Sequence, residues 1–172
     1  MELAELANDR HGEPFAVVAP LDGFHLSNAT LGERGLRTVK GAPETFDCEG
    51  FARSLARVRE EDQPILWPAF HRELDEPTTD EIAISPETKL VVVEGNYLLL
   101  DRPCWQDVRP LLDDVWYVDA PLELLRTRLI ARQIAQGRAE AEATQHVDSS
   151  DMPNARLVAG TKDQASRRIH TG

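Results

Sequence analysis

Short apolar runs bounded by turn residues recur along the chain. The clearest is 90–93, four consecutive apolar residues of which three are β-branched, between Pro86 and Gly95. A continuous apolar run without alternation is typical of a strand buried on both faces, as in a parallel sheet covered by helices. The runs at 15–19 and 115–118 have the same character. We therefore expect three buried strands at these positions.

Segments with helical periodicity separate these runs. Phe51, Leu55 and Val58 recur at i, i+4 and i+7 behind a plausible N-cap, Asp47, and predict an amphipathic helix. A second helix is expected to begin after Pro121 and to end before Gly137. Shorter helices are expected at 2–8, 103–112 and 140–145, strands at 64–68 and 81–84, a loop at 31–43 and a turn at 148–154. Strands that alternate with helices indicate an α/β protein with a parallel sheet.

Composition narrows the classes of partner. A chain of 172 residues with 41% hydrophobic content suits one domain with a real core. The net charge of −11 argues against nucleic acid or an anionic membrane as the main partner, because both need a basic face. The two cysteines lie far apart without metal-type spacing and give no zinc site. No targeting segment or apolar run of about 18 residues is present, so we expect a cytoplasmic protein and leave a homodimer open.

Two of the predicted strands end in an acid followed by glycine. Asp22-Gly23 follows the first run, and Glu94-Gly95 follows the main one. In open α/β sheets, ligands gather outside the carboxyl ends of the strands. Either acid alone could be a solvated strand end or part of a common turn. Together they could converge on one site.

Three arginines stand out in a chain this acidic. Arg128 and Arg132 are four residues apart on the second predicted helix and share a face, and Arg138 follows just past its end. They suggest an anion clamp, although a solvated helix face fits the same spacing equally well.

Five stretches in order carry a resemblance to a known family. They are 21–26, 40–47, 93–99, the arginines between 128 and 138, and Asp151-Met-Pro-Asn154. Together they resemble the small-molecule kinases of the P-loop fold, which include uridine kinase, pantothenate kinase and phosphoribulokinase. The likeness is closest to the bacterial branch called fructokinase-like or nucleoside/nucleotide kinase-like. The resemblance implies a P-loop NTPase-like, three-layer α/β fold, in which a parallel sheet has helices on both faces. It also implies a single kinase-like domain over 1–172, with a lid at about 122–145.

The resemblance also implies roles for individual residues. Asp22 is similar to the family's general base for the acceptor alcohol, and Glu94, with Asp22, to the acids that hold Mg²⁺. Arg128, Arg132 and Arg138 are similar to the lid that neutralises charge on the transferred phosphoryl group of ATP. On the substrate side, the resemblance points to His25, Lys40, Phe46, His71, Arg72, Asn96 and Tyr97.

One family motif is absent from the sequence. The glycine-rich phosphate loop, G-x-x-x-x-G-K-[ST], should lie just before residues 1–8, and it occurs nowhere in the chain. We expect that the first strand and the phosphate loop are missing because the chain starts late. The alternative is a catalytically inactive remnant of the kinase fold that binds a metabolite or a partner. Sugar, nucleoside and pantothenate-like acceptors all stay open.

Overall fold

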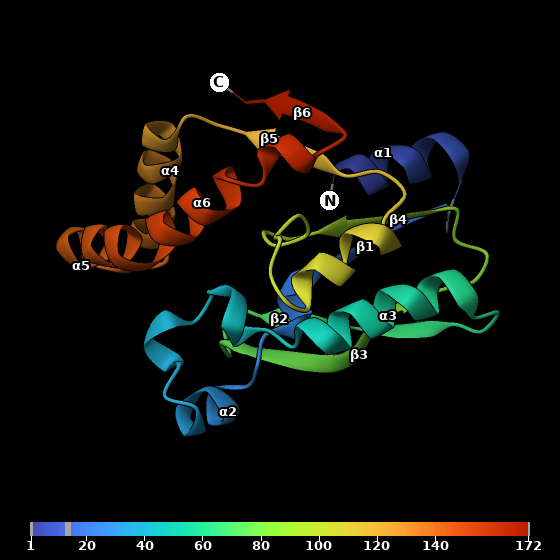
Figure 1. Ribbon diagram of the computed structural model, residues 1–172, viewed down its shortest axis with the longest axis horizontal. Coiled ribbons are helices and arrows are strands. Elements are labelled where there is room, and N and C mark those ends of the chain that lie inside the picture. Colours follow the sequence, from blue (N-terminus) through green and yellow to red (C-terminus); the bar gives the residue numbers. More distant parts are fainter. Residues whose placement is uncertain (1, 13–14, 172) are drawn as a thin grey trace. The chain divides into compact units, whose positions relative to one another are not determined.

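The computed structural model describes residues 2–12 and 15–171 (Figure 1). The chain forms two compact units. The first unit comprises Met1–Thr38 and Glu44–Asn96, and the second comprises Val39–Pro43 and Tyr97–Gly172. The expectation of one domain over 1–172, with a lid at about 122–145, stays a prediction.

A parallel pair of strands lies at the centre of the first unit. β1 (Ala16–Pro20) pairs with β4 (Leu90–Glu94) in a register that sets Ala16 opposite Leu90 and Pro20 opposite Glu94. Parallel neighbours need a long crossover connection. Here that connection includes α3 (Cys48–Glu60). Two of the predicted strands and the parallel α/β character are therefore confirmed.

An antiparallel hairpin forms the second sheet of this unit. β2 (Ile65–His71) pairs with β3 (Glu76–Ile84), and the register shifts between Trp67 and Ala69. Pro68 lies at this irregularity, which fits a residue that has no backbone N–H to donate to the ladder. Both strands were expected, but the structure makes each of them longer than the sequence pattern suggested.

Aromatic side chains fill the core of the first unit. The rings of Phe24, Phe51 and Trp67 meet edge to face, with centroids 5.2, 5.0 and 5.8 Å apart. Asp47 caps α3, because its side chain accepts a hydrogen bond of 2.9 Å from the Gly50 amide. This cap supports the predicted helix start, and the buried face of α3 carries Phe51 and Leu55 as expected.

Two shorter helices complete the first unit. α1 (Glu2–His11) is attached to β1 through Asn8, whose side chain pairs with both the N–H and the carbonyl of Ala16, at 2.7 and 2.9 Å. α2 (Asn28–Glu33) begins at Ser27, which accepts a hydrogen bond from the Thr30 amide.

The prediction of a loop at 31–43 is wrong in part. The segment holds the end of α2 and the 3₁₀ turns Arg37–Val39 and Pro43–Thr45. Its polar composition concealed Leu31, a fully buried apolar anchor.

The second unit contains the other parallel pair. β5 (Trp116–Asp119) lies beside β6 (Arg167–His170), with Trp116 opposite Arg167 and Asp119 opposite His170. A strand is thus present where one was expected at 115–118, but the expectation that it is buried is wrong, because Trp116 is 46% and Val118 62% exposed. The expected helix at 103–112 is instead two 3₁₀ turns, Trp105–Asp107 and Arg109–Leu111, the second of which contains Pro110.

Helices α4 (Leu122–Ala135), α5 (Glu140–His146) and α6 (Met152–Ala159) form the rest of this unit. A π-helical turn, Val147–Asp151, joins α5 directly to α6, so the predicted turn at 148–154 is wrong (Figure 1). Pro153 falls in the first turn of α6, where the missing N–H would have no helical partner in any case.

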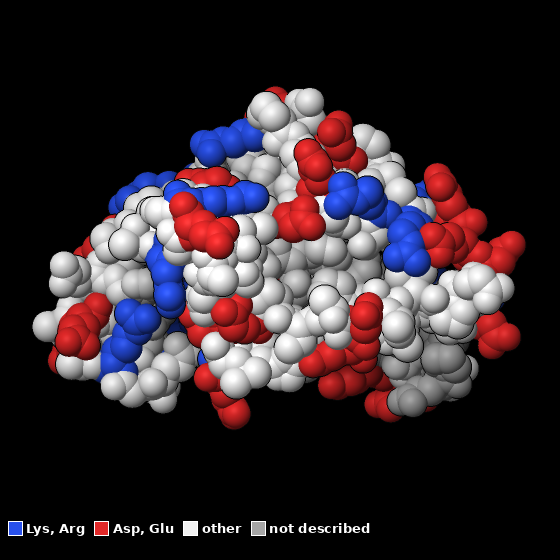
Figure 2. All heavy atoms as spheres, turned by 90° about the horizontal axis from the view of Figure 1, so that it is seen from below, with Lys and Arg blue, Asp and Glu red and all other residues white. Residues whose placement is uncertain are grey.

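Two further features are the length of the apolar helices and the distribution of charged residues on the surface. None of the described helices is long and apolar enough to cross a membrane. On the face shown in Figure 2, basic side chains lie interspersed with acidic ones.

Candidate active site

The carboxyl ends of β1 and β4 bring two acids together. Glu94 is the last residue of β4, and Asp22 follows β1 within the 3₁₀ turn Leu21–Phe24. The Glu94 side chain is solvent-accessible, yet enough protein surrounds it that desolvation raises its pKa, and the negative charge of Asp22 raises the pKa further. The positive charge of Arg72 acts in the opposite direction. Asp22 is therefore close enough for its charge to act on Glu94.

The glycine after each acid is required by packing. A Cβ on Gly23 would lie 2.2 Å from the backbone oxygen of Pro68, and a Cβ on Gly95 would lie 2.5 Å from Cβ of Leu21. No side chain fits at either distance. The strand ends that carry Asp22 and Glu94 are thus packed against neighbouring backbone and side chains, which fixes where the acids stand.

His25 lies three residues after Asp22, and its ring packs against two aromatic rings. Its Nδ1 donates a hydrogen bond of 2.7 Å to the backbone carbonyl of Asp22, which fixes the proton on that nitrogen. Its ring centroid lies 4.0 Å from that of Phe46 and 4.7 Å from that of Phe70. Phe70 was not among the expected site residues. The signal that could have found it is its place in β2, directly before the predicted His71-Arg72 pair.

His71 and Arg72 are neighbours in sequence but make different interactions. The His71 Nε2 lies 2.6 Å from Glu81 Oε1, and the Thr78 hydroxyl donates to the same oxygen at 2.7 Å. These two hydrogen bonds, Thr78 first, lower the pKa of Glu81. Arg72 is exposed and acts on Glu94. Of the two, Arg72 acts through its charge on Glu94, whereas His71 is hydrogen-bonded to Glu81 across the hairpin.

Asn96 ends the first unit, two residues past Glu94, and its side chain is exposed. It follows the same strand as Glu94, and contact of Asn96 with a substrate stays a prediction.

Lys40 and Tyr97 belong to the second unit. The Tyr97 side chain is fully buried, and its hydroxyl donates to the carbonyl of Gly41. Asn154 donates to the same carbonyl at 3.4 Å. In this structure Tyr97 supports the turn that carries Lys40, and direct contact of either residue with a substrate stays a prediction.

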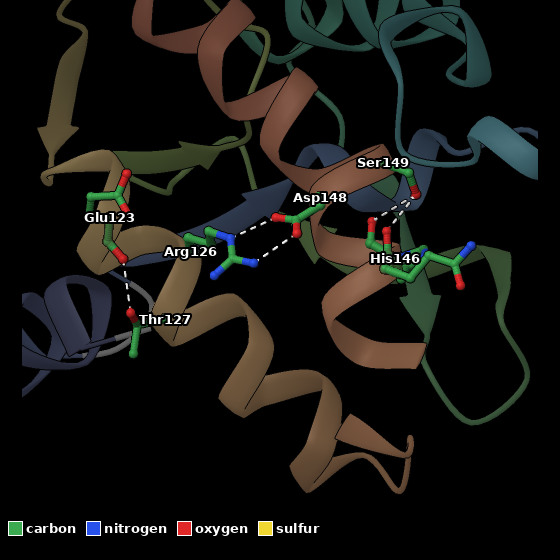
Figure 3. A network of polar contacts seen from close by, with 7 residues as sticks. Glu123, Arg126, Thr127, His146, Asp148 and Ser149 are labelled. Carbon is green, nitrogen blue, oxygen red and sulfur yellow. Dashed lines mark hydrogen bonds and ion pairs between the residues drawn. The ribbon is translucent and has the colours of Figure 1, made fainter. Parts of the chain in front are cut away.

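The arginines of α4 fall into two kinds. Arg126 makes a two-pronged ion pair with Asp148, at 2.6 and 2.7 Å, and this hydrogen bonding lowers the pKa of Asp148 (Figure 3). Arg128, Arg132 and Arg138 are exposed, and their guanidinium groups have no ion-pair or hydrogen-bond partner among the described residues. Spacing alone did not distinguish the engaged arginine from the three free ones.

The donor chemistry of the first unit suits a hard cation. The described residues contain no group of three or more His, Cys, Asp or Glu side chains that could hold a metal ion. Mg²⁺ does not need such a cage, because it keeps several waters and binds through one or two carboxylates together with substrate phosphates. Two carboxylates that repel one another at a strand end, as Asp22 and Glu94 do, fit that requirement.

Two curated relatives resemble most of the chain. It is 37% identical over 153 residues to YggC of Escherichia coli K12, whose name states no function, and covers 63% of that protein. It is 33% identical over 164 residues to a Schizosaccharomyces pombe protein provisionally named a uridine kinase, and covers 69% of it. The alignments include 89% and 91% of this chain. The chain matches no family model.

Solved structures agree with these relatives. A Silicibacter protein provisionally described as a fructose transport system kinase superposes with a TM-score of 0.88 at 34% identity, over 97% of this chain and 83% of that one. YFH7 of Saccharomyces cerevisiae, provisionally described as a P-loop kinase with a circular permutation, gives a TM-score of 0.75 at 25% identity, over 91% of this chain and 57% of that one.

The parallel strands with acids at their carboxyl ends, together with these likenesses, define an α/β protein of the P-loop NTPase-like fold. The chain belongs to the family of P-loop small-molecule kinases. Because it spans about two thirds of the curated relatives named above, the activity and substrates of the whole protein are matters for proposal.

Proposed function

We propose that the protein carrying this chain is an ATP-dependent phosphotransferase that transfers the γ-phosphate to an alcohol group of a small metabolite. The observation that supports it best is the pair Asp22 and Glu94. The two acids stand at the adjacent carboxyl ends of β1 and β4, close enough that the charge of Asp22 raises the pKa of Glu94. Phosphoryl transfer consists mostly of positioning and charge stabilisation, and it needs an acid, a metal and cations.

The two acids would divide the work at the strand end. Glu94, with Asp22, would hold Mg²⁺, which when bound neutralises charge on the phosphates. Asp22 would orient the acceptor hydroxyl and take its proton as the new O–P bond forms and the bond from the γ-phosphorus to the β–γ bridging oxygen breaks, with ADP as the leaving group. The Nδ1–H of His25, bonded to the Asp22 carbonyl, fixes the backbone from which this carboxylate projects.

The three unpaired arginines would supply positive charge. Arg128, Arg132 and Arg138 have no competing acid among the described residues, so phosphate oxygens can bind them without first breaking an ion pair. Their charge is most useful where negative charge grows in the transition state. Arg126 is already neutralised by Asp148 and has no such part.

The acceptor is proposed only as a class. The names of the relatives point to a nucleoside in one case and to a sugar in another. Hydroxyls are common to both, and to pantothenate-like compounds. The proposed substrate side comprises His25, Lys40, Phe46, His71, Arg72, Asn96 and Tyr97. A cytoplasmic location and a homodimer likewise stay predictions.

The experiment compares two proteins for acceptor-dependent ADP release from Mg-ATP. One is the 172-residue chain, and the other is the same chain joined behind a segment that supplies a first strand and a G-x-x-x-x-G-K-[ST] loop. The acceptors are a set of sugars, nucleosides and pantothenate. We expect release from the extended protein with at least one acceptor, and a loss of roughly 10²–10⁴-fold in Asp22→Asn. Asp62→Asn, the same change at an exposed position past the end of α3, should leave the rate unchanged.

The second candidate function is that of a kinase-fold module that binds a metabolite or a partner without transferring phosphate. The 172 residues themselves contain no G-x-x-x-x-G-K-[ST]. An extended protein that melts cooperatively and binds Mg-ATP, yet releases no ADP with any acceptor, would support this candidate and overturn the first.

A further inference from the structure

The turn at 39–43, which we call the Lys40 turn, is held at one atom from two directions. The carbonyl oxygen of Gly41 accepts hydrogen bonds from the Tyr97 hydroxyl, at 2.5 Å, and from Asn154 Nδ2, at 3.4 Å. Gly41 has a φ of +98°, which an L side chain rarely adopts, and the Ala42 amide closes the turn on the Val39 carbonyl at 2.9 Å. The glycine thus allows the turn to present this carbonyl to both donors.

Both donors are far from the turn in sequence. Tyr97 is 56 residues away and Asn154 is 113 residues away. Two of the contacts that hold the turn therefore come from distant segments of the folded unit. Tyr97 is itself rigid, because its ring is fully buried and lies 5.3 Å from the ring of Trp105.

Asn154 connects the turn to the helices of the second unit. It lies in the first turn of α6, which continues from the π-helical turn Val147–Asp151. Asp148 of that π-helical turn is ion-paired with Arg126 of α4. The same α4 carries Arg128 and Arg132. A continuous series of contacts therefore runs from the Lys40 turn to the helix with the free arginines.

We propose that Tyr97 and Asn154 are positioning residues that fix the Lys40 turn through Gly41 and tie it to the helical segment bearing the arginines. The proposal deepens the proposed function, because Lys40 is one of its substrate-side residues. The positioning itself does not depend on catalysis and can be measured in the chain without any substrate.

The direct test is amide hydrogen exchange in the 172-residue chain. Tyr97→Phe removes only the hydroxyl, and Asn154→Asp keeps the size of the side chain but replaces the donor with an acceptor. Loss of one hydrogen bond should speed exchange of the amides at 39–42 by roughly fivefold; residue 43 is proline and has no amide hydrogen. The effect should be greater for Tyr97→Phe, whose bond is the shorter, and greatest in the double variant.

The matched control is Tyr117→Phe. Tyr117 lies in β5, and its hydroxyl has no hydrogen-bond partner among the described residues. The control should leave exchange at 39–42 unchanged. Unchanged exchange at 39–42 in both test variants would overturn the proposal, as would a rise of equal size across the whole second unit.

A kinetic arm separates this proposal from the proposed function. In the extended protein of the ADP-release assay, Tyr97→Phe and Asn154→Asp should raise KM for the acceptor several-fold, with KM for ATP unchanged. Faster exchange without any change in acceptor KM would refute the substrate role of the Lys40 turn and leave its positioning supported. A change in acceptor KM without faster exchange would refute the positioning.

Discussion

The indole N–H of Trp67 donates a hydrogen bond of 2.9 Å to the carbonyl oxygen of Pro20, the last residue of β1. This bond joins the β2–β3 hairpin to the end of the strand, two residues before Asp22. The same side chain is fully buried against Phe24 and Phe51. One residue therefore secures both the core of the first unit and the strand end that carries the candidate base.

Replacing this indole should weaken the first unit measurably. Trp67→Phe keeps an aromatic ring but loses the donor and part of the buried volume. The free energy of unfolding should fall by about 2–4 kcal/mol, which urea denaturation followed by circular dichroism would measure. Trp116→Phe is the matched control, because Trp116 is 46% exposed and should tolerate the change within about 0.5 kcal/mol. Equal losses in the two variants would contradict the anchoring role of Trp67.

The glycines beside the acids should tolerate no side chain. In Gly23→Ala the new Cβ would overlap the Pro68 backbone, which cannot move without disturbing β2. The free energy of unfolding should fall by about 1–3 kcal/mol or more. Gly32→Ala is the opposite case, because Gly32 lies in α2 and its Cβ would meet only the Arg37 side chain at 3.9 Å. That variant should be neutral or slightly more stable, and a large loss there would show that helix context was misjudged.

The acids Glu94 and Glu81 should have opposite effects on stability as pH changes. Burial and Asp22 raise the pKa of Glu94, so the folded chain holds that proton longer and this group's contribution to stability falls as pH rises past the usual glutamate range. Hydrogen bonds lower the pKa of Glu81, so its contribution is present above that range and is lost as pH falls.

Two amide variants measured by thermal melting would test this difference. Glu94→Gln should be more stable than the unmodified chain at neutral pH, and the difference should vanish below about pH 4. Glu81→Gln should be less stable at neutral pH and should approach the unmodified chain in acid. The same sign of change in both variants would contradict the two pKa directions.

Substitution of the ion-paired Arg126 should change stability, whereas substitution of the unpaired Arg128 or Arg132 should change turnover. In the extended protein of the ADP-release assay, Arg128→Ala or Arg132→Ala should lower turnover roughly 10²-fold and weaken nucleotide binding less, with Tm unchanged. Arg126→Ala should instead lower Tm slightly, more at low salt than at high salt, because it breaks the pair with Asp148. Loss of turnover in Arg126→Ala alone would reverse the assignment.

The helices and strands that the sequence predicted best are those whose conformation is determined by the residues within them. The β-branched run before Glu94 and the capped, amphipathic α3 carry their structure in local pattern. The prediction of a turn at 148–154 was wrong because Asp, Ser, Pro and Asn, which compose most of this segment, are residues that favour turns. Burial of Val147 and Met152 overrides that tendency and makes the segment helical.

For the candidate site, the sequence predicted which residues stand at the strand ends, but it did not predict their contacts. The strand ends identified Asp22 and Glu94, because parallel register places both at one edge. Partners from distant segments could not be read from spacing. Glu81 for His71 and Asp148 for Arg126 are each known only once the chain is folded.

Asn8 has a consequence for assembly. Its side-chain amide occupies both backbone groups of Ala16, just as one residue of a neighbouring strand would. Phe15 already accepts from the Leu90 amide on the β4 side, so Asn8 closes the opposite edge of β1 where the strand begins. An extended segment from another molecule would have to displace this amide before it could extend the sheet there. Asn8 thus blocks, at the first residue of β1, the edge-to-edge pairing to which open strands are prone.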